Sequence, residues 1–178
     1  MKFQEAILKG VWLIDLNPHR DERGYFMRTA CVDEFTRHSL NTQWVQSNLS
    51  FTANKGTLRG MHFQKQPSPE IKLIQCLTGV IQDVIVDIRK DSPTFGEWIA
   101  FELSEENSQA LYVPEGFAHG FQCLSDDCRV AYQMSSFFVP ELSGGVRWND
   151  PDIEIKWPLD NPLVSVRDAG LPLLNELT

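Results

Sequence analysis

The feature that most restricts the fold of this chain is a series of short segments rich in β-branched and aromatic residues, separated by turn-forming residues. Many short strands of this kind are typical of an all-β sandwich or barrel. Little helix is expected, with short turns at 33–39, where Asp33 would be the cap, and after Ser104. Strands are predicted near residues 10–16, 25–30, 44–52, 57–64, 71–78, 80–88, 97–103, 109–113, 118–124 and 128–138.

The length favours one domain. A chain of 178 residues with 42% hydrophobic content can bury one sizeable core but hardly two. No repeat, low-complexity tract or linker rich in Pro, Gly and Ser divides it. We therefore expect residues 1–178 to form a single domain.

Two predicted strands place polar residues where a simple packed core would need apolar ones. In 80–88, Asp83 and Asp87 share a face with Ile81 and Ile85, opposite Val80, Val84, Val86 and Ile88. In 57–64, strict alternation puts Arg59, Met61 and Phe63 on one face and Leu58, His62 and Gln64 on the other. This mixing suggests a barrel whose interior is partly a polar cavity.

Charge and cysteine content limit the partners and the compartment. The net charge of −8 argues against broad binding of nucleic acid, which needs a basic face. The chain has no run of 18 apolar residues, which a membrane span would need, and no apolar stretch typical of a secretory signal. The four cysteines form no CxxC pair or zinc-site spacing and are expected to be reduced thiols. We expect a cytoplasmic protein without a nucleic-acid or membrane partner.

Two of the four histidines lie in strongly patterned β contexts, His62 in RGMHFQ and His119 in PEGFAHGF. The second motif has the spacing found in small double-stranded β-helix barrels, the cupins, many of which bind a metal through an HxH pair, a glutamate and a later histidine. Here Phe63 and Gln64 follow His62, so the pair is missing. A metal site of this type needs about three protein ligands, and we expect no metal. Each histidine alone could also be a hydrogen-bonded structural residue.

Without a metal, His62 becomes a candidate base, because the pKa of an unperturbed imidazole lies close to neutral pH. Lys72, in IKLIQC, could stabilise an oxyanion, and Tyr132, in RVAYQMSS, could donate a proton. Taken alone, each is better explained as a structural residue, Lys72 as a solvated strand lysine and Tyr132 as a core aromatic with a satisfied hydroxyl. The carboxylate that would orient the base stays open, because spacing cannot choose among Asp83, Asp87 and Asp168.

An ordered string of motifs covers nearly the whole chain: DERGYF, QSNLS, KGTLRGMHFQ, KLIQCLTGVIQDVIVDIRKDSPTFGEW, PEGFAHGF, WNDP and SVRDAGLPLL. In this order the motifs resemble those of the dTDP-4-dehydrorhamnose 3,5-epimerase family. The resemblance implies a cupin-like jelly-roll barrel, a homodimer, and epimerisation of a nucleotide-linked 4-keto-6-deoxyhexose without a metal or an organic cofactor. It also implies that His62 is the base, paired with Asp168, that Lys72 stabilises the enolate, and that Tyr132 donates the proton.

The implied substrate contacts are only partly kept. Arg23, Gln46, Asn48, Arg59 and His119 match residues that the family places around the sugar and the diphosphate. The departures are Arg28 for a glutamate, Phe138 for a tyrosine, Ser143 for a glutamate, and Arg167 for a lysine. Arg23 and Arg59, with Arg28 or Arg167, are expected to meet the diphosphate, because guanidinium groups suit phosphate oxygens.

The departures leave the ligand more open than the reaction. An epimerase that inverts only carbon 3 or carbon 5, or that acts on another nucleotide sugar, is the nearest alternative. A metal-dependent cupin enzyme is disfavoured by the missing HxH pair, and a silent sugar-binding barrel by the complete set of four candidate catalytic residues.

Overall fold

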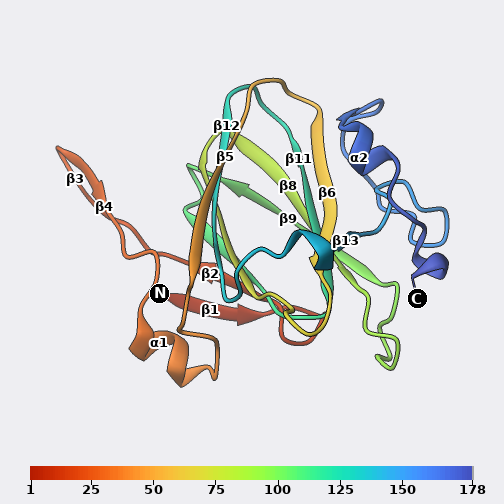
Figure 1. The fold of residues 1–178 in the computed structure, drawn as a ribbon. Coiled ribbons are helices and arrows are strands. Elements are labelled where there is room, and N and C mark those ends of the chain that lie inside the picture. Colours follow the sequence, from red (N-terminus) through yellow and green to blue (C-terminus); the bar gives the residue numbers. More distant parts are fainter. Residues whose placement is uncertain (178) are drawn as a thin grey trace.

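The computed structural model describes residues 1–177, and two facing antiparallel β-sheets dominate it (Figure 1). The first sheet has six strands in the order β1 (Lys2–Glu5), β2 (Trp12–Asp15), β10 (Gln109–Val113), β7 (Lys72–Thr78), β12 (Cys128–Met134) and β5 (Gln46–Thr52). The second runs β13 (Ser143–Gly145), β6 (Thr57–Gln64), β11 (Phe117–Cys123), β8 (Val80–Asp87) and β9 (Trp98–Ser104), and β14 (Leu163–Val164) pairs parallel to β6.

The main core lies between the two sheets. Ile74 and Leu111 of the first sheet belong to the same buried cluster as Ile81, Ile85 and Phe121 of the second. A second cluster packs the C-terminal segment against the outer face of the second sheet, and a third packs the helix α1 (Val32–Arg37) against the first. The prediction of an all-β fold is confirmed.

Several element boundaries differ from the predictions. The predicted strand 25–30 is limited to β4 (Gly24–Phe26), which pairs only with β3 (His19–Asp21) among the described residues. The strand 128–138 ends at Met134, because the backbone beyond it bonds to loop groups: Ser135 N–H donates to the Ile71 carbonyl. The short strands β1, β3, β13 and β14 were not predicted.

The helical expectations were partly wrong. Helix α1 forms where a turn was expected, but its N-cap is Cys31, and Asp33 lies inside the first turn, where its negative charge suits the helix dipole. Residues 105–108 form a hydrogen-bonded turn between β9 and β10, because the Asn107 and Ser104 side chains bond the backbone there. Helix α2 (Val166–Ala169) and two 3₁₀ helices, η1 (Pro140–Leu142) and η2 (Leu174–Glu176), were not predicted.

A β-bulge in β6 changes which side chains face the interior. His62 pairs with His119 and Arg59 pairs with Phe121, so three steps along β6 match two along β11. The extra residue brings Arg59 and His62 to the same side, and the predicted assignment of Arg59 to the opposite face was wrong. Gly60 has φ of 135° here, and a Cβ atom on it would lie 2.5 Å from Gly120 Cα. Glycine is needed at this close approach.

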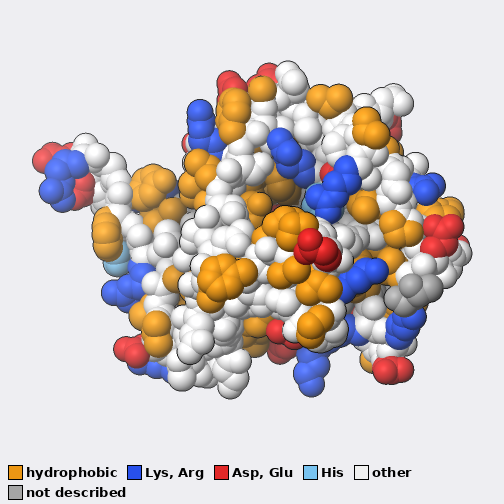
Figure 2. Space-filling model, viewed as in Figure 1, with side chains coloured by type: hydrophobic (Ala, Val, Ile, Leu, Met, Phe, Trp, Pro, Cys, Tyr) orange, Lys and Arg blue, Asp and Glu red, His pale blue; other side chains and the backbone are white. Residues whose placement is uncertain are grey.

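The β3–β4 hairpin projects from the body of the molecule (Figures 1 and 2). It carries charged residues near its turn, and the large side chains of Tyr25 and Phe26 are half or more exposed on it.

None of the helices in residues 1–177 is long and apolar enough to cross a membrane.

Candidate active site

A cavity of about 700 Å³ opens between the two sheets, next to the C-terminal segment. In Figure 2, Lys and Arg side chains border a hollow on the face shown. The cavity takes side chains from both sheets, from the loop before β7 and from the segment around α2: Gln46, Asn48, Ser50, Thr57, Leu58, Arg59, His62, Phe63, Gln64, Glu70, Lys72, His119, Phe121, Tyr132, Met134, Phe138, Ser143, Leu163, Val164, Ser165, Arg167 and Asp168.

The register of the first sheet explains one wall of this pocket. Met134 of β12 lies opposite both Lys72 of β7 and Gln46 of β5, and Tyr132 lies opposite Asn48. Residues directly opposite in antiparallel strands share a face. The alternation along three neighbouring strands therefore turns all five side chains toward the interior.

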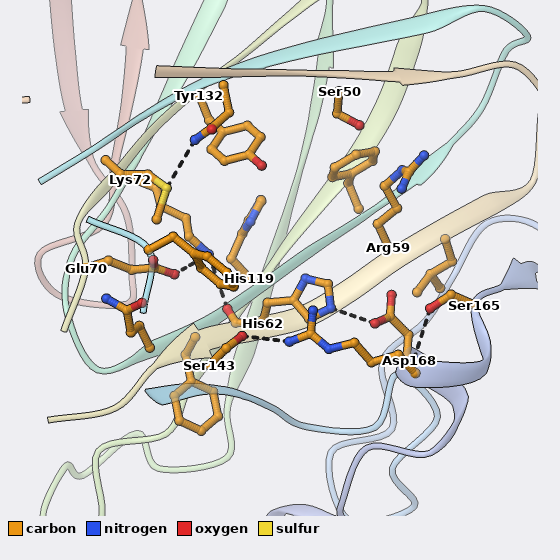
Figure 3. Close-up of a pocket in the computed structure, with 18 of the residues that line it drawn as sticks. Ser50, Arg59, His62, Glu70, Lys72, His119, Tyr132, Ser143, Ser165 and Asp168 are labelled. Atoms are coloured by element: carbon orange, nitrogen blue, oxygen red, sulfur yellow. Dashed lines mark hydrogen bonds and ion pairs between the residues drawn. The ribbon is translucent and has the colours of Figure 1, made fainter. Parts of the chain in front are cut away.

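His62 and Asp168 form a paired group on the other wall (Figure 3). His62 Nε2 lies 2.7 Å from Asp168 Oδ1, and the Gly60 N–H of the bulge donates to Asp168 Oδ2 at 3.1 Å. The Ser165 hydroxyl caps α2 by accepting from the Asp168 N–H, which fixes the backbone that carries the carboxylate. The bulge and the cap thus hold Asp168 against the histidine.

The environment keeps Asp168 ionised. Burial acts to raise the pKa of Asp168, but the hydrogen bond and charge of His62, the Gly60 N–H and the charge of Arg167 together outweigh it, so the pKa lies below its ordinary value. A charged carboxylate favours the tautomer in which His62 Nε2 carries the proton, which leaves Nδ1 as the free nitrogen.

Of the three aspartates that the sequence left open, Asp168 is the one that contacts His62 in the described residues. Asp83 Oδ2 lies 2.9 Å from Nε2 of His119, and Asp87 pairs with Arg89, so neither contacts His62. Within residues 1–177, Oδ1 of the fully buried Asp83 has no hydrogen-bond partner.

Lys72 lines the pocket, and its ammonium group contacts two oxygen atoms. Nζ forms an ion pair with Glu70 Oε1 at 2.8 Å and donates to the His62 carbonyl at 3.4 Å. The Lys72 side chain is 10% exposed and that of Glu70 is 8% exposed.

Tyr132 reaches the pocket from the first sheet, across from His62 (Figure 3). Burial raises the pKa of the Tyr132 phenol, and the charge of Glu70 raises it further, while Arg59 acts in the opposite direction. The phenol therefore keeps its proton at neutral pH.

The predicted substrate contacts are only partly brought together. Gln46, Asn48, Arg59, His119, Phe138 and Arg167 line the pocket with the four candidate catalytic residues. Gln46 accepts from the Phe138 N–H, and Arg167 donates to the Ser143 hydroxyl at 2.6 Å. Two of the departures from the family pattern, Ser143 and Arg167, thus contact each other.

Arg23 and Arg28 lie outside this pocket. Arg23 is on the projecting hairpin, 84% exposed and paired with Asp21, and Arg28 pairs with Glu34 at 3.2 Å. The reason is that their segments extend away from the barrel end where the pocket opens.

Glu70 is a pocket residue that sequence reasoning missed. It stands two positions before Lys72, a spacing that can place both side chains on one face of an extended segment. The prolines at 67 and 69 are typical of a loop. For this reason the spacing of Glu70 and Lys72 was not interpreted as part of a strand.

In the described part of the chain, no three residues among His, Cys, Asp and Glu are grouped so that they could hold a metal ion. His62 and His119 each have a carboxylate partner instead.

Comparison with known proteins agrees with this geometry. The family model for dTDP-4-dehydrorhamnose 3,5-epimerase matches residues 5–176. The enzyme of that name from Methanothermobacter thermautotrophicus is 43% identical, with 98% of this chain and 95% of the relative covered.

Two solved structures are also similar. One is the dTDP-4-dehydrorhamnose 3,5-epimerase of Bacillus anthracis with TDP and PPi bound, with a TM-score of 0.94, 40% identity, and 97% of this chain and 98% of the other covered. The other is the dTDP-6-deoxy-D-glucose-3,5-epimerase of Legionella pneumophila in complex with dTDP-4-keto-L-rhamnose, with a TM-score of 0.94, 35% identity, and coverage of 99% and 94%. The predicted cupin-like fold and isomerase class are confirmed. By sequence and by structure, the chain belongs to the dTDP-4-dehydrorhamnose 3,5-epimerase family.

Proposed function

We propose that this chain epimerises a dTDP-linked 4-keto-6-deoxyhexose at carbons 3 and 5, converting dTDP-4-dehydro-6-deoxy-D-glucose to dTDP-4-dehydro-L-rhamnose. The observation that carries the proposal is the His62–Asp168 pair, set in one wall of a pocket that also holds Lys72 and Tyr132. The membership of the family supports the same reaction and the same substrate.

The chemistry follows from the ketone at carbon 4. The ketone acidifies the hydrogens on carbons 3 and 5, because loss of either gives an enolate whose charge rests on oxygen. His62 removes the proton through Nδ1, since its Nε2 is engaged by Asp168, and the carboxylate stabilises the imidazolium that forms. Lys72 stabilises the enolate oxygen.

Inversion needs a proton from the opposite side of the sugar. His62 belongs to the second sheet and Tyr132 to the first, so a sugar held between the sheets has the base on one face and the phenol on the other. Tyr132 then protonates the carbon from the face opposite the base, which inverts the centre. No step requires a metal or an organic cofactor.

The diphosphate would bind near the basic groups of the pocket. Arg59 and Arg167 line it, and guanidinium groups can bind phosphate oxygens through two hydrogen bonds at once. The polar side chains of Gln46, Asn48 and His119 would contact the sugar and the nucleotide, and Phe138 offers an apolar surface beside them.

We propose that the chain works as a homodimer in which the β3–β4 hairpin of one copy covers the pocket of its partner. A two-stranded hairpin is marginally stable alone, and this one exposes 74% of Phe26 and 50% of Tyr25. Exposed apolar surface of this kind is typical of an interaction site. In this arrangement Arg23 of the partner subunit would reach the diphosphate, and Arg28 would lie at the base of the same hairpin.

We also propose that residues 1–178 act as one domain in the cytoplasm, without a nucleic-acid or membrane partner. The buried thiols of Cys76, Cys123 and Cys128 are free, which suits a reducing compartment.

The reaction can be tested by incubating the protein with dTDP-4-keto-6-deoxyglucose in deuterated water and following the sugar by NMR. Deuterium at both carbons 3 and 5 is expected. Label at one carbon would identify a single-site epimerase, and binding without label would contradict epimerisation of this substrate.

The assignment of the base can be tested with His62→Asn. Because the variant has no group to remove the proton, we expect turnover to fall by a factor of about 10² to 10⁴ with an unchanged circular dichroism spectrum. His38→Asn is the matched control, since His38 stacks on Phe3 outside the pocket and should leave turnover intact. Wild-type turnover in the His62 variant would show that the base is another group.

A further inference from the structure

The ammonium group of Lys72 has three N–H donors, and the structure shows one hydrogen bond and one ion pair for it. One N–H donates to the carbonyl of His62 at 3.4 Å, and Nζ lies 2.8 Å from Glu70 Oε1 in an ion pair. No third acceptor for Nζ is found among residues 1–177, while Lys72 itself lines the pocket. The ammonium group therefore has an N–H to spare for a ligand oxygen in the pocket.

Glu70 is held firmly where it meets Lys72. Next to it in the chain, the Ile71 N–H donates to Ser135 Oγ at 2.8 Å, and on its other side Ser136 Oγ donates to the Pro69 carbonyl at 2.7 Å. The backbone on both sides is thus fixed to the segment that follows β12. A carboxylate on such a rigid support can position a flexible lysine with little loss of side-chain freedom at the moment of reaction.

Stability alone is a weak explanation for this pair. Both side chains are about nine-tenths buried, and a buried ion pair is often no more stable than apolar side chains of similar volume, because both charges lose their water. The pair also faces a pocket rather than the packed core.

We propose that Glu70 is a positioning residue: its ion pair with Lys72, together with the hydrogen bond from Lys72 to the His62 carbonyl, holds the ammonium group so that a free N–H points toward the enolate oxygen. The inference rests on the proposed role of Lys72 as the group that stabilises the enolate. Because the His62 carbonyl takes part, the same contacts fix Lys72 relative to the base.

Glu70 has a second effect, on the proton donor. Burial is the largest cause of the raised pKa of Tyr132, and the negative charge of Glu70 adds to it. A phenol that holds its proton to higher pH stays competent as an acid over a wider range. The charged and titratable groups that line the pocket with Tyr132 are Arg59, His62, Glu70, Lys72, His119, Arg167 and Asp168.

The test compares Glu70→Ala with Glu70→Gln, using Glu102→Ala on the exposed side of β9 as the matched control. Loss of the acceptor in Glu70→Ala should lower kcat by about 10-fold to 100-fold, because Lys72 is no longer held in place, while KM changes less than about twofold. In Glu70→Gln an amide oxygen of the same reach can still contact Lys72 Nζ, so most of kcat should return near neutral pH. Since the negative charge is absent, the alkaline limb of its pH–rate profile should begin at lower pH than in the wild type.

Three results would overturn the inference while leaving the proposed function intact: wild-type kcat in Glu70→Ala, a change in KM alone, or a Glu70→Gln variant as slow as Glu70→Ala with the wild-type alkaline limb. Circular dichroism, thermal unfolding and binding of dTDP establish that each variant is folded. Lys72→Met, measured in parallel, separates a failure of the proposed role of Lys72 from a failure of the inference about Glu70. If Lys72→Met turned over at the wild-type rate, the role of Lys72 would be wrong and the inference would fail with it. If only Lys72→Met were slow, the inference about Glu70 alone would fail.

Discussion

Asp168 is the residue whose environment contributes most to the proposed base. Its carboxylate accepts from the Gly60 N–H and faces His62, and its lowered pKa keeps it charged at neutral pH. In Asp168→Asn the charge is lost and the amide can hold the wrong histidine tautomer. We therefore expect kcat to fall by a factor of about 10² to 10⁴, measured as the initial rate of deuterium incorporation.

The matched control is Asp160→Asn, which changes an exposed loop aspartate in the same way. Its rate should equal that of the wild type. If Asp168→Asn kept kcat within about threefold, a factor far below those typical of acid–base groups, the carboxylate would have no part in orienting the base.

For single residues, the sequence predicted which side chains share the pocket better than how they are arranged in it. The motifs selected His62, Lys72, Tyr132 and Asp168, and all four line one pocket. Residue spacing alone could not choose Asp168 over Asp83 or Asp87, because the choice depends on the C-terminal segment folding back against β6. Glu70 was missed for a similar reason, since its role appears only when Lys72 is placed in three dimensions.

The bulge in β6 is the element that most changes the site. Strict alternation separates Arg59 from His62, whereas the extra residue opposite β11 turns both inward. The sequence of a single strand does not reveal a bulge, except through a glycine, because a bulge is a property of the pairing between two strands. This is why the strand bounds 57–64 were predicted correctly and its faces were not.

Gly60→Ala tests the need for this bulge. The added Cβ would meet Gly120 Cα at 2.5 Å, at a φ of 135° that side chains rarely adopt. We expect the free energy of unfolding to fall by about 2 kcal/mol or more, from strain and overpacking together. Turnover should fall as well, because the Gly60 N–H that holds Asp168 must move.

Gly56→Ala is the control for this prediction. Gly56 also has positive φ, at 81°, but a Cβ there meets nothing within 4 Å. Thermal unfolding followed by circular dichroism should show a clearly larger loss for Gly60→Ala. Equal losses would mean that backbone conformation alone, rather than the approach of β6 to β11, determines the need for glycine.

The connection between β8 and β9 depends on a buried carboxylate that is remote from the chemistry. Asp87 accepts from Arg89, Ser92 and Thr94. Burial acts to raise the pKa of Asp87, but these hydrogen bonds outweigh it and lower the pKa to about 2, from an ordinary value of 3.8. A carboxyl with a lowered pKa in the folded state stabilises the fold above its unfolded pKa, and this contribution is lost as pH falls through the folded value.

The free energy of unfolding of the wild type should therefore exceed that of Asp87→Asn by the largest margin at pH 5 to 7. The margin should narrow between about pH 4 and pH 2, following the two pKa values. Urea unfolding at a series of pH values measures it. A margin that did not change with pH would show that the charge of Asp87 is unimportant and only its hydrogen-bonding shape matters.

For the whole molecule, the all-β fold was predictable because alternation and turn residues recur along the chain, and the two sheets confirm it. The placement of the β3–β4 hairpin was not predictable. Its residues match a motif for diphosphate contacts, yet the structure extends them away from the pocket of their own chain. A contact supplied by a second copy leaves no periodicity in the sequence, since it depends on the surface of the partner.

The proposed exchange of hairpins can be tested by mixing two variants that are each impaired in a different way. Arg23→Ala should weaken binding of the diphosphate and raise KM, because a positive charge is removed from the partner's pocket. In a mixed dimer of Arg23→Ala and His62→Asn, one pocket would carry both changes. The other would join an intact His62 to an intact Arg23 of the partner subunit and should be fully active.

Random reassociation of equal amounts makes half of the dimers mixed, so about a quarter of all pockets should regain wild-type kinetics, as follows from two-fold symmetry. If each hairpin served its own pocket, every pocket in the mixture would still carry one change, and mixing would restore nothing. Mixing wild type with His62→Asn is the control, and it should give activity in proportion to the wild-type chains alone. Turnover of the mixture above the summed turnover of the two separate variants would establish the dimer. It would also show that the partner copy supplies Arg23 to each pocket.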